Sequence, residues 1–232
     1  MTPSLITPTI LHNNPDLPTS HDSAVIGVDE VGRGCLFGHM TVAAVLLPAY
    51  LTTALDNEQK VMLTDTAFAK LTDSKKLSAK QRVTLATHIK QTASYAIVDV
   101  SATLIDKLNI HNATLLGMKS AIQALIQAHT LSHATVLIDG NYAPKLDVGF
   151  LAHTLTTLTK GDARHSSIAC ASILAKVHRD TQMCDYANAY PDYAFDKHKG
   201  YPTKAHLDAL HTHGVLAEHR KSFTPVAALL PF

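Results

Sequence analysis

Apolar residues along the chain form five short runs that are separated by polar turns and by longer segments with helical spacing. The runs cover residues 24–29, 39–48, 94–101, 134–140 and 154–162. Each has the length of a β-strand and is rich in β-branched or other apolar residues. The first two lie close enough in the chain to pair as a hairpin.

Helical spacing marks the segments 78–91, 101–110, 112–127, 166–190 and 204–213. The first of them begins after a serine that suits a helix N-cap, and the first half of 166–190 has small side chains that allow close packing on a sheet. Strands that come first and then alternate with helices indicate an α/β fold with a mixed sheet. We therefore predict a mixed β-sheet flanked by helices.

The domain organisation follows from length and composition. A chain of 232 residues, 46% of them hydrophobic, is long enough for one large domain with its own core. Residues 1–22 contain four prolines and are predicted to be a poorly ordered tail, with the folded domain spanning residues 23–232. No apolar run reaches the ~20 residues of a transmembrane helix, and the start lacks the features of a signal peptide.

Charge and cysteine content limit the possible partners and surroundings. The formal net charge is +1, so any nucleic-acid surface must be a local basic region. The 15 histidines are scattered and show no zinc-like spacing with cysteine. The three cysteines form no CxxC pair and are typical of free thiols in a reducing compartment, which favours a cytoplasmic protein.

Acidic residues follow three of the predicted strands. Asp29 and Glu30 stand side by side after an apolar run, Asp139 ends another run, and Asp162 follows a third. We expect Asp29 to end its strand and Glu30 to begin a bend, because neighbouring residues of a regular strand point to opposite faces. If the four acids converge, they need a counter-charge, and oxygen ligands suit Mg²⁺ or Mn²⁺, with two ions expected. The alternative for Asp139 and Asp162 is an ordinary turn or helix-cap role.

The glycines of VDEVGRG do not form a nucleotide-binding loop. The lysine and serine or threonine of a P-loop are replaced by Arg33 and Gly34, and the acids would repel phosphate. The glycines instead let the backbone approach a ligand closely, and Arg33 between them is suited to phosphate.

Two further features are candidates for substrate contact. Lys75 and Lys76 begin a basic cluster, for which the alternative is a solvated helix start. Tyr201 lies between a glycine and a proline, and its alternative role is a turn aromatic that packs on the core.

Six motifs occur in the order seen in one family. They are VDEVGRG, DSKKLS, LIDGN, KGDARHSSIACASILAKVHRD, KGYPT and HRKSF, and they extend from about Ser23 to Phe223. On these motifs the chain resembles bacterial ribonuclease HII, the type 2 ribonuclease H. The related type 3 enzymes carry a lysine where this chain has Arg33, and they have an additional N-terminal domain, so type 2 is preferred.

The resemblance implies a ribonuclease-H-like mixed sheet with a helical C-terminal part from about residue 200. It implies that four carboxylates bind metal and act in catalysis, namely Asp29, Glu30, Asp139 and Asp162. It implies that the substrate is bound by Gly32, Arg33 and Gly34 at the ribonucleotide 2′-hydroxyl and by Tyr201 on the following sugar. Lys75 and Lys176 complete the substrate-binding set, as the family's phosphate-side and structural lysines. Asp180 matches a family acid that we interpret as structural.

The function expected from the resemblance is metal-dependent cleavage of RNA in RNA/DNA hybrids and at single ribonucleotides embedded in duplex DNA. The products would keep a 3′-hydroxyl and a 5′-phosphate, and the process would serve DNA replication and repair. A non-catalytic hybrid-binding protein is the alternative, but it would not need four acids in a phosphate groove. A DNA nuclease of the same fold would share the acids but not the GRG and GYP motifs.

Three segments depart from the family pattern or lie outside its motifs. Residues 48–72 and 140–161 are longer than is usual in the family. The apolar end VAALLPF either packs back on the body or binds a partner such as a replication clamp.

Overall fold

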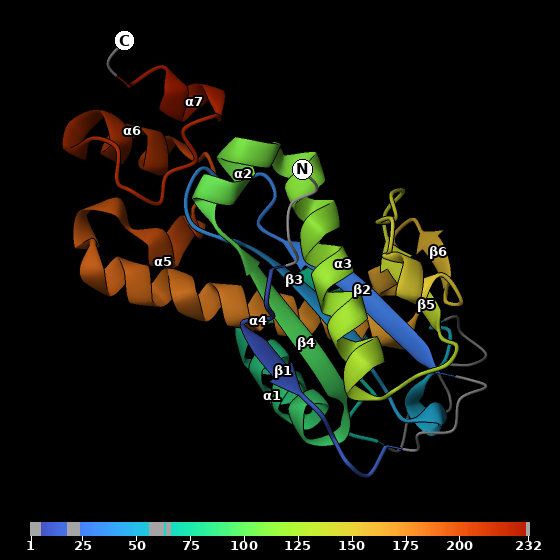
Figure 1. Cartoon of the computed structure of the whole chain (residues 1–232). Helices are drawn as coiled ribbons and strands as arrows, with labels where there is room; N and C mark the ends of the chain where they lie inside the picture. Colours follow the sequence, from blue (N-terminus) through green and yellow to red (C-terminus); the bar gives the residue numbers. More distant parts are fainter. Residues whose placement is uncertain (1–5, 18–23, 56–62, 64–65, 231–232) are drawn as a thin grey trace.

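A six-stranded mixed sheet forms the centre of the protein (Figure 1). The structure is a computed structural model that describes residues 6–17, 24–55, 63 and 66–230. Strand order is β1-β4-β3-β2-β5-β6, in which β2 pairs with β3 antiparallel and with β5 parallel. The strands are β1 (Ile10–His12), β2 (Val25–Val31), β3 (Met40–Leu46), β4 (Ser94–Val100), β5 (Thr135–Asp139) and β6 (Thr154–Leu158). The mixed sheet predicted from the apolar runs is confirmed.

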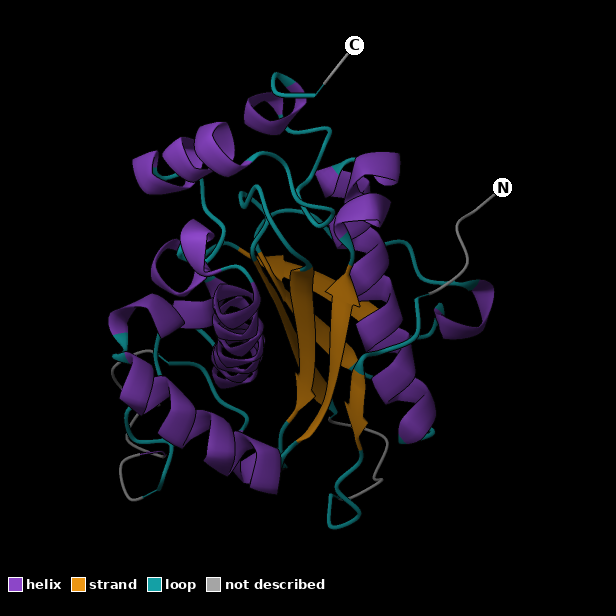
Figure 2. Cartoon of the chain, turned by 90° about the vertical axis from the view of Figure 1, so that its left-hand side faces the viewer, coloured by secondary structure: helices purple, strands orange, loops and turns teal. Residues whose placement is uncertain are grey.

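Helices cover both faces of this sheet, as the two views show (Figures 1 and 2). On one face α4 packs directly against β2 and β3, and α1 packs against α4. On the other face α3 lies on β3 and β4 and is joined by α2. The bounds of these helices are α1 (Ala79–Thr92), α2 (Ala102–Leu108), α3 (Ile110–Ala128) and α4 (Ser166–Ala189). Each face therefore has its own apolar core.

The close contact between α4 and the sheet depends on small residues. A Cβ atom placed on Gly27 of β2 would lie 2.1 Å from the main-chain carbonyl carbon of Ser167 in α4. Because backbone meets backbone here, only glycine fits at this position. The start of α4 is thereby held against the strand that carries the acidic pair.

The C-terminal part is helical, as predicted, and extends from the end of α4. It contains α5 (Phe195–His198), α6 (Lys204–His213) and α7 (Thr224–Ala227). Phe37 stacks on Phe195 with ring centroids 3.9 Å apart, and the fully buried Val226 packs with Leu36 and Leu210. The apolar C-terminal end thus packs on the body as far as the structure describes it.

The N-terminal segment differs from the tail predicted for residues 1–22. Residues 10–12 form β1 and pair with β4, and Leu17 is buried in the core. The backbone N–H of Asn14 donates to the hydroxyl of Ser94 at 2.8 Å. The prolines flank this short edge strand and do not interrupt it, so a proline-rich segment can still contain an ordered strand. Residues 1–5 and 18–23 lie outside the described residues.

Short 3₁₀ turns connect the larger elements. They are η1 (Ala49–Leu51), η3 (Ser74–Lys76), η4 (Val148–Phe150), η5 (Gly161–Ala163) and η6 (Pro191–Tyr193). Much of the long segment 48–72 lies outside the described residues. Among the helices that the structure describes, none is both long enough and apolar enough to span a membrane.

Candidate active site

Acidic side chains gather where β2 and β5 cease to pair. The parallel pairing ends at Val28 and Ile138. Asp29 and Glu30 follow on β2, and Asp139 is the last residue of β5. Because the two strands no longer pair beyond this point, the side chains that follow lie in the space between the strand ends.

The strand does not bend between the adjacent acids, so that expectation is wrong. β2 stays paired with β3 through Val31. Asp29 and Glu30 therefore project to opposite faces of the sheet end. Asp29 faces Ser172 of α4, whereas an oxygen of Glu30 lies 3.2 Å from the guanidinium of Arg33. Both acids still line one cleft, because β5 no longer pairs with β2 beyond Val28 and leaves that edge of β2 open.

Asp162 also lies near these acids, but it comes from a turn and not from a strand end. It lies in η5, next to Gly161, whose backbone N–H donates to Oδ1 of Asp139 at 2.6 Å. Its side chain is buried and lies near the carboxylates of Asp73 and Asp139. The turn after β6 is thus attached to the end of β5.

Burial and mutual repulsion make these acids costly to ionise. Burial raises the pKa of Asp29 well above its ordinary value, and the charges of Glu30 and Asp139 raise it further. Burial also raises the pKa of Glu30, against the opposing effect of Arg33. The pKa of Asp162 is raised by burial and then by neighbouring carboxylates. A cation between these groups would stabilise their charged forms.

The donor set fits a divalent cation. All the candidate ligands are carboxylate oxygens, which suit Mg²⁺ and Mn²⁺. Oε2 of Glu30 is buried and accepts no hydrogen bond from the residues that the structure describes. Among those residues, no group of three or more aspartate, glutamate, histidine or cysteine side chains lies close enough together to hold a metal ion as the structure stands. The mutual repulsion of these carboxylates would be relieved by a cation lying among them.

A cleft of about 430 Å³ brings the predicted residues together. Three of the four acids line it, together with all the predicted substrate-binding residues: Asp29, Glu30, Asp139, Gly32, Arg33, Gly34, Lys75, Lys176 and Tyr201. Asp162 is not among the lining residues and connects to the cleft through its neighbour Asp139.

Two buried arginines hold the loop of Gly32 and Arg33. Gly32 has a φ of +89°, and a Cβ atom there would lie 2.3 Å from Nε of Arg179. Arg179 donates to three main-chain carbonyl groups around this loop. Arg220 donates to the carbonyl of Arg33 at 2.8 Å and to that of Gly38. The loop is therefore fixed from behind by groups that do not face the cleft.

Tyr201 lies beside the same loop and is 40% exposed, so its ring is available to a ligand. Its Cε1 atom is 3.9 Å from the place that a Cβ of Gly34 would occupy. A core-packing role, the alternative for this residue, would require it to be buried.

Two buried histidines support Tyr201 through a chain of hydrogen bonds. The N–H of Leu216 donates to Nδ1 of His219 at 2.9 Å, so the proton of this ring is on Nε2. That proton is directed at Nε2 of His206, 3.2 Å away. Nδ1 of His206 in turn donates to the carbonyl of Tyr201 at 2.9 Å. Burial lowers the pKa of both histidines to about 4, so both are neutral at neutral pH.

Two lysines, Lys75 and Lys176, line the cleft. Nζ of Lys176 lies 2.5 Å from Oδ1 of Asp180. Asp180 also lies 3.8 Å from Arg82, which donates to the carbonyl of Ser74 and so holds the turn that carries Lys75. This agrees with a structural role for Asp180.

Several residues at the site were not predicted. Ser74 and Ser172 line the cleft with their hydroxyls 2.9 Å apart, and Asp73 lies against Asp162. Asp73 and Ser74 begin the motif DSKKLS, in which the lysines attracted attention first. Ser172 lies in a run of small residues that was interpreted only as a packing surface.

The family model of Ribonuclease HII matches residues 26–226. The chain is 43% identical over 225 residues to "Ribonuclease HII" of Psychrobacter arcticus, covering 88% of this chain and 77% of the relative. It is 45% identical over 216 residues to "Ribonuclease HII" of Shewanella sp. strain ANA-3, covering 93% and 94%.

Two solved structures share the fold. One is the PCNA:RNase HII complex from Archaeoglobus fulgidus, with a TM-score of 0.61, 21% identity and coverage of 90% of this chain and 97% of the other. The second is Bst-RNase HIII in complex with Mn²⁺, with a TM-score of 0.63, 18% identity and coverage of 89% and 69%.

Proposed function

The chain belongs to the ribonuclease HII family, and we propose that it uses divalent metal to cut RNA/DNA hybrids and single ribonucleotides within duplex DNA. Family membership makes it an endonuclease of the ribonuclease H type. The observation that carries the finer proposal is the single cleft that contains three acids, the GRG loop, two lysines and an exposed tyrosine.

The proposed metal ligands are Asp29, Glu30, Asp139 and Asp162. When bound, Mg²⁺ or Mn²⁺ would activate a water for attack on the scissile phosphate and would stabilise the charge that develops there. The Mn²⁺ in the Bst-RNase HIII neighbour supports this choice of ion. The buried position of Asp29 and the hydrogen bond that Asp139 accepts from Gly161 would keep these ligands oriented.

The remaining residues of the cleft would hold the substrate. Lys75 and Lys176 line the cleft, where they would face phosphates, and Arg33 would add the charge of the loop. Main-chain groups of Gly32 and Gly34 would contact the 2′-hydroxyl, which is the chemical difference between RNA and DNA. Tyr201 would stack on the next sugar, so that the enzyme recognises the junction from RNA to DNA.

The reaction proposed here leaves a 3′-hydroxyl and a 5′-phosphate and would serve the removal of ribonucleotides during DNA replication and repair. We also propose a contact with a replication clamp through the C-terminal end. It is supported by the Archaeoglobus neighbour, which was solved with PCNA. Because Val226 is buried, the contact would use residues beyond it.

The direct test is cleavage of a DNA duplex that carries one ribonucleotide, in Mg²⁺, in Mn²⁺ and with EDTA, and with an all-DNA duplex as control. We expect a cut at the ribonucleotide, with the stated ends, only when metal is present. Binding without cleavage under all conditions would instead support the hybrid-binding alternative.

A second test separates junction recognition from general positioning. Tyr201→Ala should slow cleavage at a single ribonucleotide more than cleavage within a long hybrid, while Tyr201→Phe should be milder because it keeps the ring. If Tyr201→Ala slows both substrates by the same factor, Tyr201 does not read the junction.

A further inference from the structure

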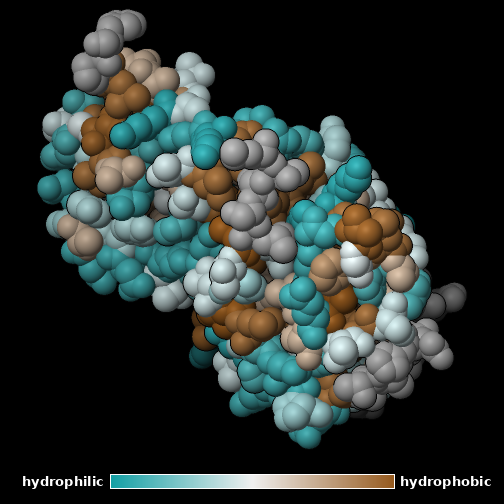
Figure 3. Space-filling view, viewed as in Figure 1, coloured by the Kyte–Doolittle hydropathy of each residue, from teal (hydrophilic) through white to brown (hydrophobic). Residues whose placement is uncertain are grey.

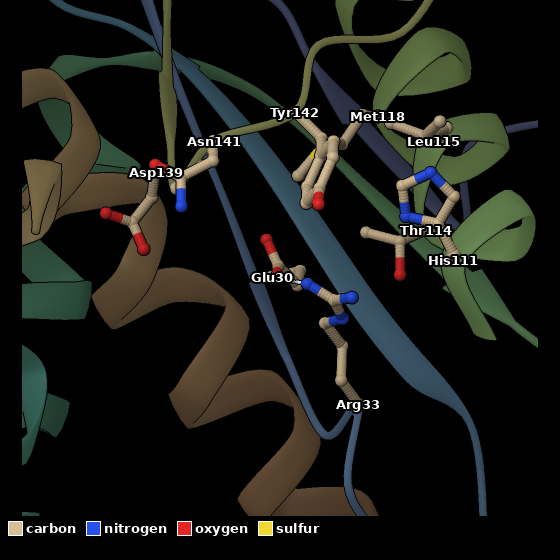
Figure 4. A pocket seen from close by; sticks show the side chains of 10 residues that line it. Glu30, Arg33, His111, Thr114, Leu115, Met118, Asp139, Asn141 and Tyr142 are labelled. Carbon is tan, nitrogen blue, oxygen red and sulfur yellow. Dashed lines mark hydrogen bonds and ion pairs between the residues drawn. The ribbon is translucent and has the colours of Figure 1, made fainter. Parts of the chain in front are cut away.

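A second hollow adjoins the acidic cleft on the α3 side of the sheet (Figure 4). It shares Glu30, Arg33 and Asp139 with the cleft, and its other wall is built from α3 and from the segment after β5. Its remaining lining residues are His111, Thr114, Leu115, Met118, Gly140, Asn141 and Tyr142. The acids therefore have a candidate binding surface on each side.

Tyr142 is the most exposed side chain with an aromatic ring at either hollow. It is 60% exposed, yet its ring packs edge-on against His111 with centroids 4.8 Å apart and an angle of 81° between the planes. The ring is thus supported from one side by α3 while much of it stays open. In Figure 4 the Tyr142 ring and the Arg33 side chain both reach into this hollow.

The neighbouring Asn141 adds a polar group. Its Oδ1 accepts a hydrogen bond from the hydroxyl of Thr159 at 2.8 Å, which fixes the side-chain amide. Its amide nitrogen, Nδ2, donates no hydrogen bond within the part of the chain that the structure describes. An aromatic face beside a free amide donor and an arginine is a suitable surface for a nucleoside, because the ring stacks and the donors meet oxygen or nitrogen acceptors.

We propose that Tyr142 stacks on a nucleoside of the cleaved strand, on the side of the scissile phosphate away from Tyr201, with Asn141 as its hydrogen-bonding neighbour. This contact rests on the proposed function and on the continuity of the second hollow with the cleft. Tyr142 and Tyr201 lie on the α3 side and the α4 side of the same acids, since the cleft of Tyr201 also includes Ser172 and Lys176 of α4. A strand held over the acids would meet one tyrosine before the cut and the other after it.

The first experiment compares Tyr142→Ala, Tyr142→Phe and a control, Tyr50→Ala. Tyr50 is 65% exposed but lies after the far end of β3, away from both hollows. Affinity for a labelled duplex with one ribonucleotide is measured by fluorescence anisotropy in an Asp29→Asn background, in which cleavage should be strongly reduced; a gel confirms that the duplex stays intact. Loss of one base stack predicts about 10-fold weaker binding for Tyr142→Ala. Tyr142→Phe and Tyr50→Ala should bind as the parent does.

The second experiment locates the contact. Abasic sites are placed one at a time along both strands, and the loss in affinity is measured for the parent, Tyr142→Ala and Tyr201→Ala. In Tyr142→Ala the penalty should vanish at one position of the cleaved strand, on the side of the scissile phosphate away from the sugar that Tyr201 is proposed to contact. Tyr201→Ala should keep the parent's pattern of penalties, because an abasic site retains the sugar. A vanished penalty on the uncut strand, or on the same side as Tyr201, would refute the proposal.

The outcomes separate this contact from the proposed function. If the wild type cleaves and binds but Tyr142→Ala equals Tyr50→Ala, the contact is wrong and the function stands. If the wild type neither cleaves nor binds the duplex, the proposed function fails, and the contact fails with it.

Discussion

Acid should weaken the C-terminal part of the protein through the pair His206 and His219. Both rings are fully buried, and their hydrogen bonds require both to be neutral. A proton added to Nε2 of His206 would meet the proton that His219 already carries on its own Nε2. His198 stacks on His206 with ring centroids 4.5 Å apart, and burial lowers the pKa of His198 as well. The cation of Arg220 follows His219 directly.

The direction and size of the effect follow from the two pKa values. The folded pKa of each histidine is about 4, below the usual 6.5. Between these values the unfolded chain binds more protons, so the free energy of unfolding falls as the pH falls. At pH 5 the expected loss is about 2 kcal/mol for each histidine, or roughly 4 kcal/mol for the pair. That is a large share of the ~5–15 kcal/mol that stabilises a typical domain.

The assay is urea unfolding at pH 7.5, 6 and 5 of the wild type, His219→Asn and a control, His211→Asn. The asparagine at 219 can still accept from Leu216 but cannot titrate, so we expect a loss of about 1–3 kcal/mol at pH 7.5. Its further loss on going to pH 5 should be about 2 kcal/mol smaller than that of the wild type. His211 is exposed on α6 and lies outside the buried pair, so His211→Asn is the control for replacing a histidine on this helix. Equal pH slopes for all three proteins would show that His219 does not cause the loss of stability in acid.

Three further predictions concern the site and its supports. Asp29→Asn should reduce cleavage by at least ~100-fold, because it removes a proposed metal ligand. In EDTA the same variant should melt at a higher temperature than the wild type, because one of several repelling buried charges is gone. A folded variant that cleaves at the wild-type rate would exclude Asp29 from the site. Gly32→Ala should cost about 2–4 kcal/mol in urea unfolding, since its φ is +89° and Nε of Arg179 lies 2.3 Å from the new Cβ; unchanged stability would contradict this packing. Deleting residues 226–232 should lower the melting temperature measured by calorimetry, because burial of the Val226 side chain alone is worth about 1.5–3 kcal/mol; an unchanged melting temperature together with loss of clamp binding would favour the docking role instead.

Sequence patterns were reliable where the signal is local. The cap of α1 is an example: Ser78 accepts from the N–H of Gln81, and the side chain of Gln81 returns the bond. The long helices and five of the strands also appear where periodicity placed them, because each has enough residues to show its period. The strand at residues 10–12 was missed because three residues are too few to show alternation.

The acids illustrate the limit of local reasoning within the site. Their positions after apolar runs were visible in the sequence, but the bend expected between Asp29 and Glu30 is absent. Whether a strand continues depends on its partners: β3 stays beside β2 through Val31, whereas β5 stops at Asp139. The partner that opens the site comes from a segment more than a hundred residues away in the chain.

Local patterns were enough to place the long helices and five strands, to pick out residue types for metal and phosphate chemistry, and to find the motifs that mark the family. The groups that support and flank the site became visible only in the folded protein: Arg220 on the carbonyl of Arg33, His219 hydrogen-bonded to His206, and Tyr142 on the α3 side of the acids. Burial, hydrogen-bond partners and the sharing of a cleft depend on which distant segments pack together. Local periodicity records which face of an element is apolar, and it does not record which element will cover that face.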